Sequence, residues 1–140
     1  MLGVAAMAAV DEVVFHQLLS WHSFYDRSTP DVALLSDGLL QTAYLALLVA
    51  GLFGYADLRR RDALARRSLR AAFLTGAGAF QLFDGVVDHK VLGLHQVRAG
   101  VADLLPYDLA WDGAALVLRV VGLLLLRRTR DEGAAPRAAR

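Results

Sequence analysis

The chain has 140 residues, 56% of them hydrophobic, and a mean hydropathy of +0.42. Soluble domains average about 45 to 50% apolar residues, so this composition favours a membrane protein and the lipid bilayer as its surroundings. The formal net charge of +1 gives no basis for nucleic-acid binding, and the absence of cysteine excludes disulfides, thiolate metal ligands and redox thiols.

Four apolar stretches follow one another, at residues 1–20, 38–56, 71–92 and 109–126. Each is close to the roughly 20 residues that a helix needs to cross the hydrocarbon of a bilayer. The first is unlike a secretory signal, because Asp11, Glu12 and His16 lie within it and no basic residue precedes them. Since lipid cannot satisfy exposed backbone amides, the sequence predicts an all-α bundle of four transmembrane helices.

Arginine placement predicts the orientation of these spans. The connection 57–70 and the segment after the last span are rich in arginine, whereas connections 23–37 and 96–108 contain several aspartates and few basic residues. By the positive-inside rule, both basic segments lie in the cytoplasm of a bacterium, with the protein multi-pass in the inner membrane and both termini cytoplasmic. The tail 129–140 has too little apolar content to fold, so we expect it to be disordered.

A repeated motif divides the chain into two halves. Residues 11–22 read DEVVFHQLLSWH and residues 84–95 read DGVVDHKVLGLH, an offset of 73 residues. Asp37-Gly38 and Asp112-Gly113 repeat at an offset of 75. We therefore expect two tandem helical hairpins, repeat one at 1–56 and repeat two at 71–128, within one domain 1–128. Because each hairpin has an even number of spans, the repeats should be related by a pseudo-two-fold axis along the membrane normal.

All four histidines of the chain belong to the repeated motif. On a straight α-helix Asp11 and His22 lie about 16 Å apart along the axis, so the helix must loosen, plausibly at Ser20 and Gly93, for the histidines to meet. Imidazole with carboxylate suits zinc, iron or copper. The expected site lies near the outer membrane face, and its candidate metal ligands are His16, His22, His89, His95, Asp11, Asp37, Asp84, Asp108 and Asp112.

Two carboxylate pairs at one-turn spacing, Asp84 with Asp88 and Asp108 with Asp112, resemble those of di-metal helical bundles. If the protein is an enzyme, which the sequence leaves open, Asp88 and Asp112 are the candidate proton acceptors. Arg119 is expected to neutralise Asp11 or Asp84 from the fourth span.

Other uses of the polar cluster stay open. Buried polar residues also join membrane helices by hydrogen bonds, a histidine from each repeat offers two axial ligands to haem, and acidic and histidine side chains relay protons. A metal-handling protein would pass copper or zinc to a delivery partner that the sequence does not identify. The lack of cysteine and the presence of only two methionines disfavour cuprous copper. A homodimer is compatible with so small a bundle.

The motifs VDEVVFHQLLSWH, DGLLQ and FDGVVDHKVLGLHQVR resemble those of a bacterial membrane-protein family known as domain of unknown function 2243, along nearly the whole chain. The resemblance implies a membrane protein in which His16, His22, His89, His95, Asp11, Asp84 and Asp37 occupy recurring polar positions, with no reaction assigned. Members often carry histidine where this chain has Gln41. The encoding of some relatives beside copper-assembly factors of terminal oxidases implies copper handling or oxidase assembly as an alternative role.

Overall fold

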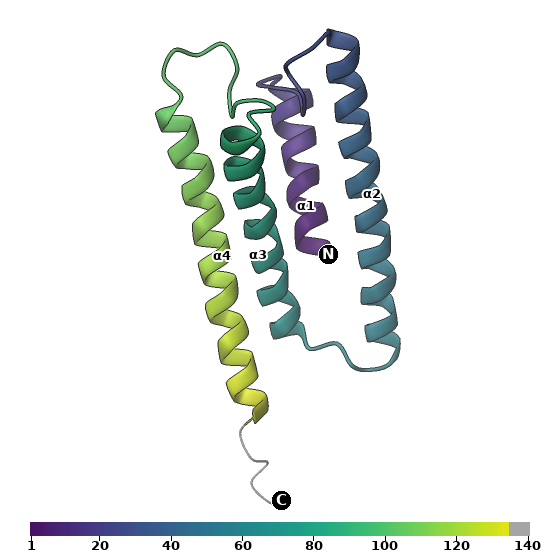
Figure 1. Ribbon diagram of the computed structural model, residues 1–140. Coiled ribbons are helices and arrows are strands. Elements are labelled where there is room, and N and C mark those ends of the chain that lie inside the picture. Colours follow the sequence, from purple (N-terminus) through teal and green to yellow (C-terminus); the bar gives the residue numbers. More distant parts are fainter. Residues whose placement is uncertain (135–140) are drawn as a thin grey trace, which may run out of the picture.

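The computed structural model describes residues 1–134, with side chains through Thr129, and all regular structure in this part is helical. The helical elements form four rods, which lie side by side in Figure 1. The first rod joins α1 (Leu2–Val10) to a π-helical segment, η1 (Asp11–Leu18), and the third joins α3 (Arg66–Phe83) to a second one, η2 (Asp84–Val91). The second and fourth rods are the long α-helices α2 (Pro30–Arg60) and α4 (Leu105–Ala134).

The rods pack as an open row in the order α2, α1, α3, α4. α1 and α3 contact each other at the centre, α2 covers α1, and α4 covers α3. Within the described residues, α2 and α4 make no contact with each other. The two central rods therefore carry the polar motifs, and the two flanking helices shield them.

The flanking helices present apolar side chains outward. α2 and α4 are the two helices that are long and apolar enough to cross a membrane, with mean hydropathies of 1.7 and 1.9 over their best windows. Only 11% and 17% of those windows are buried inside the protein. A core helix of a soluble protein would be mostly buried, so lipid is the medium that suits these surfaces.

The first and third rods do not pass the same test, although both were predicted as spans, because α1 is only nine residues long and α3 begins with three arginines within its 18 residues. The first rod carries Asp11, Glu12 and His16, which are buried against the rest of the protein. The third carries Asp84 and Asp88, also buried. Their polar side chains therefore face other parts of the protein, as polar groups in a lipid environment must.

Helix ends extend beyond the predicted apolar stretches. Thr29 caps α2, because its Oγ1 accepts a hydrogen bond from the Val32 amide at 3.4 Å, and Pro30 occupies the first turn. The last part of the predicted connection 23–37, from Pro30 onward, is therefore helical. The basic connection is also shorter than 57–70, since α2 runs to Arg60 and α3 begins at Arg66. Charged residues with high helix propensity continue a helix after its apolar part ends.

The central rods approach closely at small residues. A Cβ on Gly3 of α1 would collide with the Phe73 carbonyl of α3, and one on Gly76 would lie 3.3 Å from the Val4 amide of α1. α3 and α4 meet in the same way where Gly78 faces Ala115 and Arg119. Such small-residue contacts let backbones of membrane helices pack without side chains between them.

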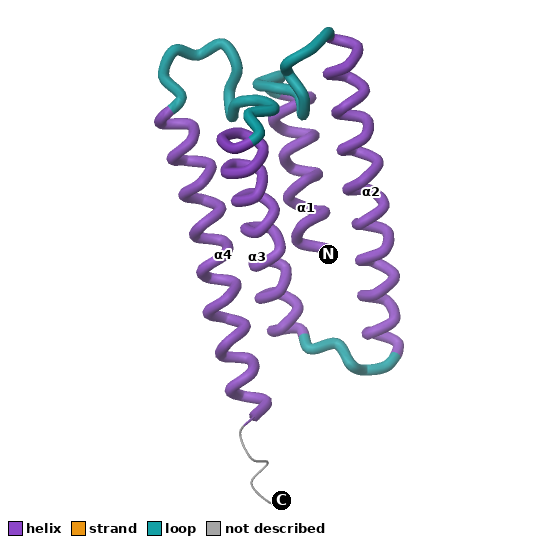
Figure 2. The backbone as a smooth tube through the Cα atoms, viewed as in Figure 1, coloured by secondary structure: helices purple, strands orange, loops and turns teal. Residues whose placement is uncertain are grey.

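α4 continues through Ala134, into the first part of the tail that was predicted to be disordered. The remainder of that tail, residues 135–140, lies outside the described residues. Figure 2 shows that the connections after η1 and η2 lie together at one end of the row. The basic connection between α2 and α3 lies at the opposite end.

Candidate metal centre

The helical turns that carry the motif are wider than α-helical turns. η1 and η2 span eight residues each, and η2 begins 73 residues after η1. A π-helix joins residue i to residue i+5, so residues five apart lie about one turn apart on the same face. The π-helical turn therefore puts His16 on the same face as Asp11, and His89 on the same face as Asp84. An α-helix would not do so.

Each wide segment ends at a backbone turn that reverses the chain. Ser20 has φ 49° and Gly93 has φ 57°, both in the left-handed region. The chain leaves the helix at these two residues, as the sequence predicts, and the second histidine of each motif folds back toward the first. Serine in this region is strained, whereas glycine adopts it freely.

Two groups of side chains are candidate metal ligands and are called the first and second ligand sets. The first consists of Asp11, His16 and His22. Asp11 Oδ2 lies 3.5 Å from His16 Nε2, and Asp11 Oδ1 lies 3.7 Å from His22 Nε2. Asp11 is 1% exposed. The carboxylate therefore lies within reach of both imidazoles.

The second ligand set consists of Asp84, His89 and His95. Asp84 Oδ2 lies 3.0 Å from His89 Nε2, and Asp84 Oδ1 lies 3.5 Å from His95 Nε2. The two Nε2 atoms of His89 and His95 are 2.9 Å apart. Each contact joins residues that lie 73 positions after those of the first set.

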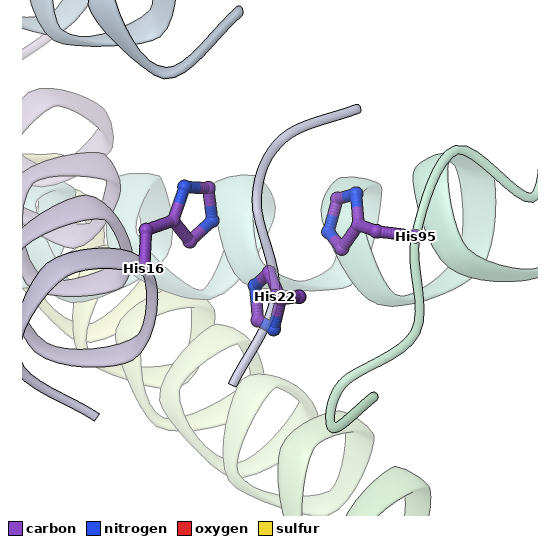
Figure 3. A group of neighbouring side chains, drawn as sticks. All are labelled: His16, His22 and His95. Carbon is purple, nitrogen blue, oxygen red and sulfur yellow. The ribbon is translucent and has the colours of Figure 1, made fainter. Parts of the chain in front are cut away.

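The four imidazoles form one cluster between the central rods. Figure 3 shows His16 on its helix, with His22 and His95 on the two connections that follow η1 and η2. Ring centroids are 4.5 Å apart within each set and 6.0 Å apart for His16 with His95 and for His22 with His89. The predicted meeting of the histidines therefore occurs in the structure.

The second histidine of each motif is fixed by the other connection. His22 Nδ1 lies 2.8 Å from the Val97 carbonyl, and His95 Nδ1 lies 2.9 Å from the Phe24 carbonyl. A carbonyl only accepts, so each Nδ1 carries a proton, and in the neutral imidazole each Nε2 keeps its lone pair. A metal-binding histidine is commonly oriented in this way by a partner on its other nitrogen.

Two carboxylates orient His16 from outside the first ligand set. Its Nδ1 lies 2.9 Å from Glu12 Oε2 and 3.2 Å from Asp37 Oδ1, and Asp37 also accepts from the Phe24 amide at 2.7 Å. Sequence reasoning missed Glu12 because residue 85 is glycine, so Glu12 is not repeated. Its spacing of four from His16 and its position in an apolar stretch were signals that could have identified it.

Among the described residues, Asp108 and Asp112 make no ion pair with the four histidines. Their carboxylates face Lys90, at 3.0 and 3.6 Å from its Nζ. Asp88 is buried next to the cluster on η2, and its carbonyl accepts from the Leu94 amide at 2.8 Å.

Arg119 donates to the Thr75 carbonyl at 3.1 Å, so the expected ion pair with Asp11 or Asp84 is absent among the described residues. The reason is the position of Arg119, which packs beside Gly78 of α3, farther along the third rod from the cluster than Asp84 is.

Buried ligand atoms without hydrogen-bond partners remain at the centre of the cluster. They include His16 Nε2, His22 Nε2 and Asp11 Oδ1. One ligand atom each from His16, His22 and His95 lies within 4.8 Å of the others, as do those of Asp84, His89 and His95 and those of Glu12, His16 and Asp37. These are the residues that could hold a metal ion.

Two pockets reach the cluster from the end of the row. One, of about 260 Å³, is lined by His89, Gly93 and His95, together with Arg27. The other, of about 440 Å³, is lined by His16, Ser20 and His22. Asp26 and Ala99 lie in the lining of both. Each ligand set therefore has its own opening.

Comparisons with known proteins give one result. No curated protein and no solved structure matches the chain. A family model described as "Predicted membrane protein (DUF2243)" matches residues 1–129, which is most of the chain. The protein therefore belongs to this family of predicted membrane proteins, as the resemblance of its motifs implies.

Proposed function

We propose that the protein is a membrane-embedded metalloprotein that binds a transition metal, zinc, iron or copper, in its histidine and aspartate cluster. The observation that carries the proposal is the set of buried ligand atoms that lack partners. His16 Nε2 and His22 Nε2 make no hydrogen bond and point at a buried carboxylate at 3.5 and 3.7 Å. Burying such groups unpaired costs several kcal/mol, and a bound cation would offset that cost.

The proposed architecture is two tandem hairpins that span the bacterial inner membrane four times. Reciprocal contacts at an offset of 73 support the repeat, since the Asp26 amide donates to the Leu94 carbonyl and the Ala99 amide to the Trp21 carbonyl. The facing pair Gly3 and Gly76 has the same offset. This pattern favours a pseudo-two-fold axis between α1 and α3.

The proposed orientation puts the cluster at the outer face of the membrane. Arg59, Arg60 and Arg61 at the end of α2 and Arg66 at the start of α3 lie at the opposite end from the cluster. Positive residues prefer the cytoplasmic side, which leaves the cluster and its two pockets outside. Metal would then enter, leave or act from the outer side.

A metal ion fits the cluster better than haem. His22 and His95 are the histidines that face each other across the two halves, and their rings stack at a centroid distance of 4.5 Å. A porphyrin bound by two histidines must lie between them, and a gap filled by ring contact has no room for it. The two pockets suit either the transfer of a metal to a partner or the access of a small substrate, for which Asp88 is the proton acceptor nearest the cluster.

The test is elemental analysis of protein purified in detergent without added metal, together with its optical spectrum. Stoichiometric zinc, iron or copper is the expected result, and His16→Ala with His89→Ala should remove it. A Soret band would identify haem instead. Metal content that is unchanged in the double variant would contradict the assignment of the ligands.

A further inference from the structure

We infer that the cluster holds two transition-metal ions, one on the first ligand set and one on the second. The inference rests on the proposed metal-binding function and adds the number of ions and their placement. Each ion would take one carboxylate and two imidazoles, from Asp11, His16 and His22 in one case and from Asp84, His89 and His95 in the other.

In each set the distances from the carboxylate to its two imidazoles are close to those around a single ion. Ligands at 2.0 to 2.2 Å from a tetrahedral ion lie about 3.3 to 3.6 Å apart. The carboxylate-to-imidazole distances are 3.5 and 3.7 Å in the first set and 3.0 and 3.5 Å in the second. In the second set one ligand atom from each residue lies within 4.8 Å of the others, and the 2.9 Å between His89 Nε2 and His95 Nε2 is shorter than ligand spacing. In the first set each oxygen of Asp11 lies near one imidazole, so each set offers three ligands and leaves a fourth position for a shared or external group.

The stacked rings favour two ions rather than one. His22 and His95 lie face to face, with 15° between their planes. Two imidazoles that bind one ion point their nitrogens at the same position. Here His22 Nε2 lies 3.7 Å from Asp11, and His95 Nε2 lies 3.5 Å from Asp84. Each stacked ring therefore has the carboxylate of its own set as a neighbour, which suits two ions side by side.

The charges of the buried carboxylates also favour two ions. Asp11, Glu12 and Asp84 are at most 1% exposed, and the Asp37 side chain is 16% exposed. Within the described residues their close charged partners are histidines, with no lysine or arginine in an ion pair with them. With Asp88, which is buried next to them, these are five carboxylates. Two divalent cations would balance four of them, whereas one would balance only two.

A single ion has two alternative positions, one between His16, His22 and His95 and one between Glu12, His16 and Asp37. The first would use both stacked rings, and either would leave Asp84 with His89 unused. The second carboxylate and its histidine, 3.0 Å apart and almost fully buried, would then lack a role. The two-ion arrangement uses all six residues.

The test is a titration of metal-free, full-length protein in detergent with Cu²⁺ alone, followed by removal of unbound metal and elemental analysis. The expected ratio is two ions per chain in the wild type and one in each of the matched variants His16→Asn and His89→Asn. A wild-type ratio of one overturns the inference and leaves the proposed function intact. A ratio of zero overturns the proposed function itself.

A second measurement does not depend on the folding of any variant. Two Cu²⁺ ions in adjacent sets should give the electron paramagnetic resonance spectrum of a spin-coupled pair in the wild type. An isolated-ion signal that accounts for all the bound copper overturns the inference. In the titration, the loss of both ions from a variant that keeps the wild-type circular dichroism spectrum also overturns the inference.

Discussion

His22 and His95 stack their imidazole rings with centroids 4.5 Å apart, although 73 residues separate them in the chain. Each ring uses its two nitrogens differently. Nδ1 donates to the carbonyl of Val97 or Phe24 on the other connection, and Nε2 lies next to the carboxylate of its own set. One nitrogen therefore joins the two halves of the protein, and the other is available to a metal.

Substitution of His95 should separate these two uses. His95→Asn places an amide donor near the Nδ1 position, so we expect it to keep the bond to the Phe24 carbonyl and lose metal. His95→Gln places its amide near Nε2 and should leave that buried carbonyl unpaired, at a cost of about 1 to 3 kcal/mol. Metal content and thermal unfolding of the metal-free variants check the prediction. Equal unfolding temperatures for the two variants would contradict it.

Glu12 should control the affinity of the first ligand set without binding the metal directly. Its Oε2 lies 2.9 Å from His16 Nδ1, and partners of this kind typically change metal affinity by about 10- to 100-fold. We expect Glu12→Ala to weaken binding by that factor in a competition titration with a chelator. Gln17→Ala is the control, because Gln17 donates to Glu12 Oε1 at 2.8 Å and does not contact His16. An equal loss in both variants would argue against a direct role for Glu12.

Much of the fold and part of the cluster could be predicted from the sequence. Hydropathy identified α2 and α4, and the duplicated spacing of Asp11, His16 and His22 identified the residues that meet. Ser20 and Gly93 were identified as the places where the helices end, because serine and glycine weaken a helix. These features depend on local composition and on the repeat, which a single sequence displays.

Three features depend on information that the sequence does not display. The π-helical turns change which residues share a face, and an α-helical spacing of 100° per residue hides the pairing of Asp11 with His16. The repeat predicts the same ligand role for Asp37 and Asp112, yet within the described residues only Asp37 is paired with a histidine. Glu12 was overlooked because its counterpart is Gly85, whose missing side chain leaves space that Asp112 fills.

The turn at residue 93 should tolerate substitution less well than the turn at residue 20. Gly93 has φ 57°, a left-handed conformation that costs a residue with a Cβ about 1 to 2 kcal/mol, so Gly93→Ala should destabilise the protein by that amount. The Arg27 guanidinium, 2.5 Å from such a Cβ, is the end of a flexible side chain and can move aside. Ser20→Gly is the matched control, since glycine relieves the strain of φ 49°. Thermal unfolding in detergent measures both. A Gly93→Ala variant as stable as Ser20→Gly would show that neither turn is strained.

Asp37 and Asp112 occupy corresponding places before the second and fourth helices, and the structure predicts opposite results for their removal. Asp37 lies 3.2 Å from His16 Nδ1 and also accepts from the Phe24 amide, so Asp37→Ala should weaken metal binding by about 10-fold or more. Asp112 faces Lys90 at 3.6 Å, and Lys90 has Asp108 as a closer partner at 3.0 Å.

Asp112→Ala should therefore leave metal affinity within a factor of about two and change stability by no more than about 1 kcal/mol, as for a partly exposed ion pair. A chelator competition on both variants gives the comparison. If Asp112→Ala weakens binding as much as Asp37→Ala, then Asp112 reaches the second ligand set when metal is bound. In that case Asp37 and Asp112 have equivalent roles in the two halves. If only Asp37→Ala weakens binding, the duplicated halves differ in how their first histidine is oriented.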